Sequence, residues 1–145
     1  EIVMIFDSGL NDIDSNIFRS KYLLMIEDIA KSFPNKIGYY FKGKELEETK
    51  NIFQAPLAGI GINSSVSLKE TNSIYTKGFI QGNFDENKML LDEKNLKDEI
   101  NLFCDHVKSI KNFNGWVCSL GHGINKATPE KNVHLFIDTI RKKFS

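Results

Sequence analysis

The chain has 145 residues, of which 41% are hydrophobic and 26% are charged, a composition typical of one globular domain. Nineteen basic side chains balance nineteen acidic ones, so the overall charge provides no attraction to nucleic acid or to an anionic membrane. No apolar run approaches the roughly 20 residues of a membrane-spanning helix, and residues 1–6 lack the basic region of a secretory signal. Cys104 and Cys118 are too few for a disulfide framework, and we expect two buried thiols in a reducing cytoplasm.

Five short apolar runs alternate with amphipathic helix patterns along the chain. The first run, residues 1–6, is continuous and partly β-branched, as expected for a strand covered on both faces. The predicted buried face of the next helix consists of Phe18, Tyr22, Met25, Ile26, Ile29 and Phe33, which recur at helical spacing. Ser15 or Asn16 is expected to cap this helix, and Pro34 and Asn35 to end it.

The next three units have the same alternation. Strands are predicted at residues 36–41, 57–62 and 78–82, and helices at residues 45–53 and 68–75. A long helix follows the fourth strand, and its predicted stripe consists of Leu96, Ile100, Phe103, Cys104, Val107 and Ile110. Asn114 and Gly115 are expected to close it.

The fifth strand, residues 116–120, leads into a loop and a last helix. Thr128 at the cap and Pro129 at the first helical position predict where that helix begins. Its predicted buried residues are Val133, Phe136, Ile137, Ile140 and Phe144. Because the five β–α units have short connections and no linker separates them, we predict one domain of parallel strands over residues 1–145.

Two architectures accommodate five such units: an open doubly wound sheet, or part of an eight-stranded barrel. A doubly wound sheet usually has a glycine-rich phosphate turn after its first strand. Here that strand is followed by Asp7, Ser8 and a single glycine, Gly9. Five strands cannot close a barrel, so a barrel would need further strands from elsewhere.

In both architectures function is built where the strands end. The polar residues there are Asp7, Ser8, Lys42, Lys44, Asn63, Ser64, Ser65, Gln81, Asn83, Asp85, Ser119 and His122. In Gly121-His122-Gly123, the two glycines would permit unusual dihedral angles and a close ligand approach. The imidazole could bind a carboxylate or exchange a proton near neutral pH, or it could only cap the loop. His106 and His134 lie in amphipathic helices and are expected at the surface.

The other strand-end residues have structural alternatives. Asp7 and Ser8 could position a substrate or cap a turn, and we expect Asp85 to cap its local turn. Lys42 and Lys44 form a small positive cluster that is either solvated or attracts a polyanionic substrate. The sequence has no nucleophile elbow, phosphate-binding loop, dinucleotide turn or metal-ligand spacing. A site without cofactor or metal is therefore expected.

Three segments carry a family resemblance. Residues 117–140 begin Val-Cys-Ser-Leu-Gly-His-Gly-Ile and continue through a short loop, Thr-Pro and a helix that opens with Asn-Val. Residues 5–8 read Ile-Phe-Asp-Ser, and residues 81–85 read Gln-Gly-Asn-Phe-Asp. In order and spacing these segments resemble the uroporphyrinogen decarboxylase family, which has Asn-Leu-Gly-His-Gly-Ile, Leu-Phe-Asp-Ser and Gln-Gly-Asn-Leu-Asp there.

The resemblance implies an α/β fold of the (β/α)8 TIM-barrel type, of which this chain supplies about five C-terminal β–α units. It implies a cytoplasmic homodimeric carboxy-lyase that converts uroporphyrinogen to coproporphyrinogen in porphyrin and heme biosynthesis, without a cofactor. By position Phe6 matches a pocket-wall residue, and Ser8 and His122 match residues that contact the tetrapyrrole substrate. The family's main acidic residue and its substrate-binding arginines would lie N-terminal to this chain. We therefore assign no catalytic residue here, and expect a fragment that is inactive alone.

The chain also departs from the family pattern. Residues 9–11 replace an aromatic residue and Ala-Gly, Phe41 and Glu86 stand where the family has proline, and a family aspartate is replaced near Asn63. The differences at residues 9–11 and near Asn63 motivate a second hypothesis, a divergent non-catalytic member that acts as a binding or assembly subunit. A third is an unrelated small α/β domain whose Gly-His-Gly is coincidental. The related corrinoid-dependent methyltransferases bind zinc through a His-x-Cys pair, and residues 39–42 read Tyr-Tyr-Phe-Lys there, which disfavours that activity.

Overall fold

The computed structural model describes residues 1–113 and 115–145. Within them a parallel five-stranded sheet has the order β1-β2-β3-β4-β5. Its strands are β1 (Val3–Asp7), β2 (Ile37–Phe41), β3 (Gly59–Gly61), β4 (Phe79–Gln81) and β5 (Trp116–Val117). The last three are shorter than predicted, and beyond β5 only a single bridge pairs Leu120 with Phe84.

A helical segment follows each strand. The α-helices are α1 (Ser15–Ile17), α2 (Leu23–Ser32), α3 (Leu46–Thr49), α4 (Leu68–Ile74), α5 (Glu93–Ser109) and α6 (Glu130–Phe144). The shorter segments are the 3-10 turns η1 (Leu10–Asp12), η3 (Lys50–Gln54) and η4 (Glu86–Leu90) and the π-helical turn η2 (Phe18–Tyr22). Across the described part of the chain, no helix has both the length and the apolar character needed to cross a bilayer.

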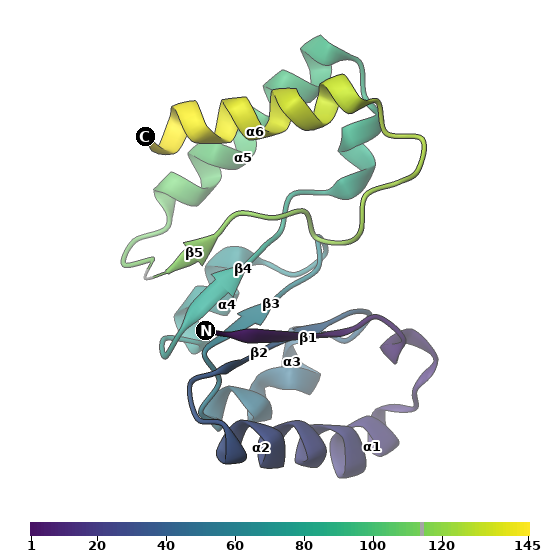
Figure 1. Cartoon of the computed structure of the whole chain (residues 1–145), viewed down its shortest axis with the longest axis vertical. Helices are drawn as coiled ribbons and strands as arrows, with labels where there is room; N and C mark the ends of the chain where they lie inside the picture. Colours follow the sequence, from purple (N-terminus) through teal and green to yellow (C-terminus); the bar gives the residue numbers. More distant parts are fainter. Residues whose placement is uncertain (114) are drawn as a thin grey trace.

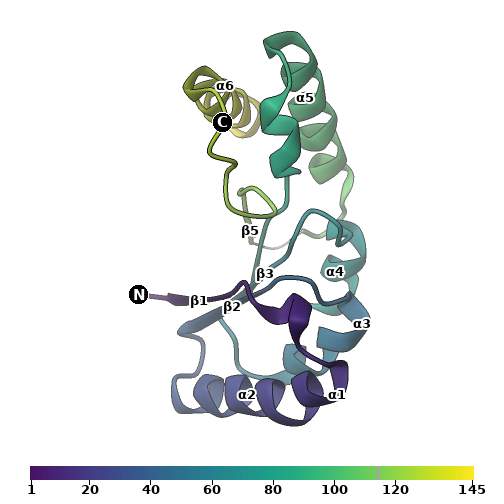
Figure 2. The same ribbon diagram turned by 90° about the vertical axis from the view of Figure 1, so that its right-hand side faces the viewer.

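The strand order decides between the two predicted architectures. Neighbouring strands follow one another in sequence, without the reversal of order that defines a doubly wound sheet. In Figure 1, α5 and α6 lie at one end of the molecule and α1 and α2 at the other. Figure 2 shows the helices in an arc outside the strands, from α2 through α3 and α4 to α5 and α6. This α/β arrangement of five parallel strands is that of a partial TIM-type barrel, as predicted.

Inner-face side chains form two layers across the strands. In register, the layer nearer the amino ends consists of Met4, Gly38, Gly59 and Phe79, and the layer nearer the carboxyl ends of Phe6, Tyr40, Gly61 and Gln81. Met4 and Phe79 fill the space above the two glycines of the first layer, since a Cβ on Gly59 would lie 2.5 Å from the Phe79 ring. The inner face is therefore packed near the amino ends, and space remains near the carboxyl ends.

Two hydrophobic clusters hold the helices to the outer face of the sheet. The larger one includes Phe18, Ile26, Tyr39, Phe41, Phe53, Ile60, Tyr75 and Ile80. The smaller one joins α5, α6 and η4 and consists of Phe84, Met89, Leu96, Ile100, Cys104 and Phe136. Successive side chains of each strand point in turn to these clusters and to the inner face. Only those on the inner face can reach a site there.

The first helix corrects the sequence prediction. Its buried positions are Phe18, Leu23, Ile26 and Ala30. Met25 and Phe33, predicted on the buried face, are 58% and 56% exposed. The π-helical turn η2 accounts for Met25, because its wider turn changes the phase of the helix between α1 and α2. Phe33 lies outside the helix, as its C-cap with φ −130° and ψ 66°. The cap is Asp14, whose carboxylate accepts from the backbone N–H groups of Asn16 and Ile17, and not Ser15 or Asn16.

The two long C-terminal helices confirm one prediction and correct another. On α5 the predicted stripe is buried at Leu96, Ile100, Cys104 and Val107. The helix ends at Ser109, earlier than predicted, and the expected closing residue Asn114 lies outside the described residues. On α6, Ile137 and Phe144 were expected to be buried but are 38% and 40% exposed. The sequence does not show that this helix packs chiefly against α5 and η4, which cover only part of its apolar face.

The start of α6 also differs from the prediction. Pro129 is the N-cap, with φ −62° and ψ 134°, and Glu130 is the first helical residue. Thr128 therefore does not cap the helix, and its hydroxyl oxygen is buried without a hydrogen-bond partner. The proline begins the helix one position later than the Thr-Pro pattern indicates.

Candidate functional site

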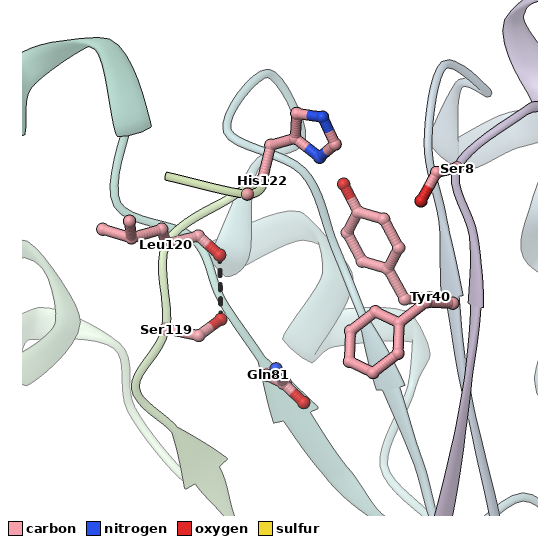
Figure 3. A pocket seen from close by; sticks show the side chains of 8 residues that line it. Ser8, Tyr40, Gln81, Ser119, Leu120 and His122 are labelled. Carbon is pink, nitrogen blue, oxygen red and sulfur yellow. Dashed lines mark hydrogen bonds between the residues drawn. The ribbon is translucent and has the colours of Figure 1, made fainter. Parts of the chain in front are cut away.

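A cavity of about 440 Å³ lies on the inner face of the sheet, where the strands end at their carboxyl ends (Figure 3). It is lined by Phe6, Ser8, Tyr40, Gln81, Ser119, Leu120, His122 and Gly123. These residues come from β1, β2, β4 and the segment after β5. The fold therefore brings together Phe6, Ser8 and His122, the three residues that the sequence singled out for substrate contact.

On β1, strand alternation separates Asp7 from its two neighbours. Phe6 and Ser8 face the cavity, whereas Asp7 accepts a hydrogen bond from the hydroxyl of Tyr39, 3.1 Å away, on the helix side. Burial, and then the negative charge of Asp7, raise the pKa of Tyr39. Asp7 thus serves the packing of β1 against β2, and Ser8 remains as the polar group of this strand end in the cavity.

Tyr40 lines the cavity although the sequence analysis did not select it. It stands beside Phe6 in register, with 5.7 Å between the ring centroids, and Gly61 leaves space for its ring. Its hydroxyl donates a 2.8 Å hydrogen bond to the carbonyl oxygen of Gly121. Burial, with a contribution from the charge of Glu86, raises the pKa of Tyr40 to about 12, so the hydroxyl stays protonated near neutral pH. The alternation along β2 could have indicated it, because Tyr40 lies between Tyr39 and Phe41, whose side chains face the helices.

The glycines around His122 act differently from the prediction. Neither Gly121 nor Gly123 has a φ in the left-handed range, so unusual dihedral angles do not explain them. Gly121 is packed so closely that a Cβ would overlap the backbone nitrogen of Ser64. Gly123 has nothing within 4 Å of an added Cβ. Close approach of the loop after β3 therefore requires a glycine at position 121.

His122 meets a lysine at the rim of the cavity. Its Nε2 lies 2.8 Å from Nζ of Lys42, which directly follows β2. In Figure 3 the side chains of His122, Tyr40 and Ser8 gather at one end of the cavity, and those of Gln81 and Ser119 lie toward the other. The site therefore combines an aromatic wall with hydroxyl, amide and imidazole groups.

Sequence comparison adds to this geometry. The sequence profile described as "Uroporphyrinogen decarboxylase (URO-D)" matches residues 1–143. The chain belongs to the uroporphyrinogen decarboxylase family. Uroporphyrinogen decarboxylases of Francisella tularensis subsp. novicida and of Rickettsia bellii are each 29% identical to it over 97% of this chain and 42% of their own length. The enzyme of Orientia tsutsugamushi is 27% identical over 100% of this chain and 43% of its own length. The chain thus spans less than half of these relatives.

A solved structure supports the barrel assignment. A methyltransferase from Methanosarcina mazei superimposes with a TM-score of 0.77, over 100% of this chain and 43% of that protein, at 15% sequence identity. At that identity the likeness shows the fold alone. Membership of the uroporphyrinogen decarboxylase family also rules out an unrelated small domain with a coincidental Gly-His-Gly.

Other strand-end residues of this family member build the loops. Lys44 is only 6% exposed and donates to the carbonyl oxygen of Ile13 at 2.6 Å, so the prediction of a solvated Lys42–Lys44 cluster is wrong for Lys44. Asp85 caps η4 by accepting from the backbone N–H of Asn87, as predicted. His106 and His134 are exposed, as predicted.

The thiols lie away from the cavity lining. Cys104 is a buried free cysteine, as expected, whereas Cys118 is half-buried. Burial raises the pKa of both thiols, to about 12 for Cys118. Among residues 1–113 and 115–145, no group of three histidine, cysteine or acidic side chains is arranged to hold a metal ion.

Proposed function

We propose that this chain is part of a uroporphyrinogen decarboxylase, a cytoplasmic carboxy-lyase that converts uroporphyrinogen to coproporphyrinogen without a cofactor. The observation that carries the proposal is the convergence of Phe6, Ser8 and His122 on one cavity at the carboxyl ends of the strands. These are the positions at which the sequence resembles the family's substrate-contacting residues. The carboxyl end of a barrel is also where enzymes of this fold carry their sites.

The chemistry of the cavity suits a tetrapyrrole with carboxylate side chains. The ring of Phe6 is 59% exposed and offers an apolar surface to a pyrrole ring. The Ser8 hydroxyl and the His122 imidazole can donate hydrogen bonds to carboxylates. In each decarboxylation the bond between the acetate methylene and the carboxyl carbon breaks, CO₂ leaves, and a proton takes its place on the methylene carbon. The role of this chain is to bind and orient the macrocycle, and the acidic group that stabilises the cationic pyrrole is expected from another part of the complete barrel.

A non-catalytic family member is the alternative. The departures from the family pattern at residues 9–11 and near Asn63 favour it. Such a protein would bind a porphyrinogen, or assemble with related chains, without releasing CO₂. Formation of coproporphyrinogen from uroporphyrinogen would support the enzyme, and its absence would support the non-catalytic member.

The test of the site is His122→Ala in the product of the native gene. Removing a hydrogen bond to a charged group costs about 1.5–3 kcal/mol, so we expect coproporphyrinogen to form about 10- to 100-fold more slowly. The unfolding temperature should stay near that of the wild type, because His122 lies at the cavity rim. His134→Ala, which changes an exposed histidine of α6, is the matched control and should retain full activity. Wild-type kinetics in His122→Ala would show that this histidine does not act on the substrate.

A further inference from the structure

Lys42 brings a cationic side chain to His122 from a distant part of the sequence. The two residues are 80 positions apart, and the barrel register places the end of β2 next to the loop after β5. Lys42 directly follows Phe41, the last residue of β2. Tyr40, two residues earlier and on the same side of the strand, lines the cavity. Lys42 thus continues the row of β2 side chains that faces the cavity.

The hydrogen bond between these two side chains has a defined direction. An ammonium group carries donors only, so Nζ of Lys42 donates and Nε2 of His122 accepts. The ring proton of a neutral His122 then lies on Nδ1. This leaves Nδ1–H and the other ammonium protons as donors for a ligand at the rim.

The charge of Lys42 has no acidic partner among the salt bridges of residues 1–113 and 115–145. Asp7, at the end of the neighbouring strand β1, accepts a hydrogen bond from the Tyr39 hydroxyl on the other face of the sheet. The charge of Glu86 contributes, after burial, to the raised pKa of Tyr40. The residues that line the cavity itself include no aspartate, glutamate, lysine or arginine. A positive group bonded to a neutral imidazole at the mouth of such a cavity fits an anion.

We propose that Lys42 and His122 together bind one carboxylate of a polycarboxylate substrate. Lys42 supplies the positive charge. Its hydrogen bond to Nε2 also keeps the ring proton of His122 on Nδ1, where it can be donated to the same anion. The inference rests on the proposed function for the identity of that substrate, whose acetate and propionate groups supply the carboxylates. It adds Lys42 as a substrate-positioning residue and fixes the tautomer of His122.

The tautomer is tested by ¹⁵N NMR of the histidine rings in the product of the native gene. We expect the wild-type His122 ring to carry its proton on Nδ1, and Lys42→Met to shift it to Nε2–H. Lys36→Met is the matched control, because Lys36 is exposed at the opposite end of β2 and its loss removes the same charge. An Nε2–H tautomer in the wild type, or no change in Lys42→Met, would overturn the proposed hydrogen bond.

Carboxylate binding is tested by fluorescence titration with uroporphyrin and with its methyl ester, which has the same ring without negative charge. Lys42→Met should weaken binding of uroporphyrin about 10-fold, the size expected for a charge-assisted contact. Its affinity for the ester should not change, and Lys36→Met should match the wild type for both. Equal uroporphyrin affinities of Lys42→Met and the wild type would overturn the inference.

Uroporphyrin affinity and uroporphyrinogen turnover test the carboxylate pair and the decarboxylase assignment separately. Turnover of uroporphyrinogen with unchanged affinity in Lys42→Met would refute the carboxylate pair and leave the decarboxylase assignment in place. A 10-fold loss of uroporphyrin affinity in Lys42→Met, in a protein that releases no CO₂, would support the pair and refute the catalytic assignment.

Discussion

At the scale of single residues, Gly121 and Gly123 flank the same histidine in very different surroundings. A Cβ on Gly121 would overlap the backbone of Ser64, which cannot move aside as a flexible side chain can. The carbonyl of Gly121 also accepts the hydrogen bond of Tyr40. Around Gly123 an added Cβ meets nothing within 4 Å. The first glycine therefore fixes where the loop lies, and the second does not.

Gly121→Ala should accordingly destabilise the protein by about 1–3 kcal/mol, the usual cost of overpacking a closely packed contact. Gly123→Ala should change stability by no more than about 0.5 kcal/mol, as surface substitutions do. Urea unfolding followed by circular dichroism gives both values. Equal midpoints for the two variants would show that the loop after β3 does not constrain Gly121.

Some of the site could be predicted from single residues and some could not. The strand-end positions of Phe6, Ser8 and His122 follow from local motifs, and all three line the cavity. The pairing of Lys42 with His122 depends on the order and register of the strands, which no local pattern contains. Lys44 differs from Lys42 only in its position in the turn, and that position buries it against Ile13.

At the scale of secondary-structure elements, Asn132 joins α6 to the segment that leads away from the cavity. It is 1% exposed, and its side-chain amide donates to the carbonyl oxygens of Met89 and Leu91, at 2.8 and 2.9 Å. Met89 belongs to η4, which follows this chain's Gln-Gly-Asn-Phe-Asp segment and its cavity residue Gln81. One side chain thus ties the C-terminal helix to the β4 strand end.

Asn132→Ala should destabilise the protein by about 1–3 kcal/mol, because it leaves the buried carbonyl group of Met89 and the part-buried one of Leu91 without their donor. Asn51→Ala, at an exposed asparagine of η3, is the control and should unfold near the wild-type urea concentration. If Asn132→Ala unfolds at the same urea concentration as the control, the two hydrogen bonds do not hold α6 to η4.

Helical phase explains for which helices the buried face could be predicted from the sequence. The stripe of α5 was predictable because the helix runs without interruption from Glu93 to Ser109. The buried face of α2 was not, because the π-helical turn η2 rotates it and exposes Met25. The face of α6 depends on which neighbours cover it, and periodicity alone does not give that.

At the scale of the whole molecule, the described sheet has two strands with one neighbour each, β1 and β5. Ile2, Val3 and Phe6 on or next to β1 are 51%, 61% and 59% exposed, and Val117 on β5 is 43% exposed. Strand edges and apolar surface of this kind are usually covered in a native protein. Under the proposed function, the remaining units of a complete barrel pair with both edges and cover these side chains.

We propose that this chain belongs to a working uroporphyrinogen decarboxylase. The most direct measurement is anaerobic incubation of uroporphyrinogen with the product of the native gene, followed by chromatography of the oxidised porphyrins. We expect successive loss of the four acetate carboxyl groups, with coproporphyrin as the final product. Recovery of unchanged uroporphyrin from a folded protein would contradict it and would favour a binding or assembly subunit.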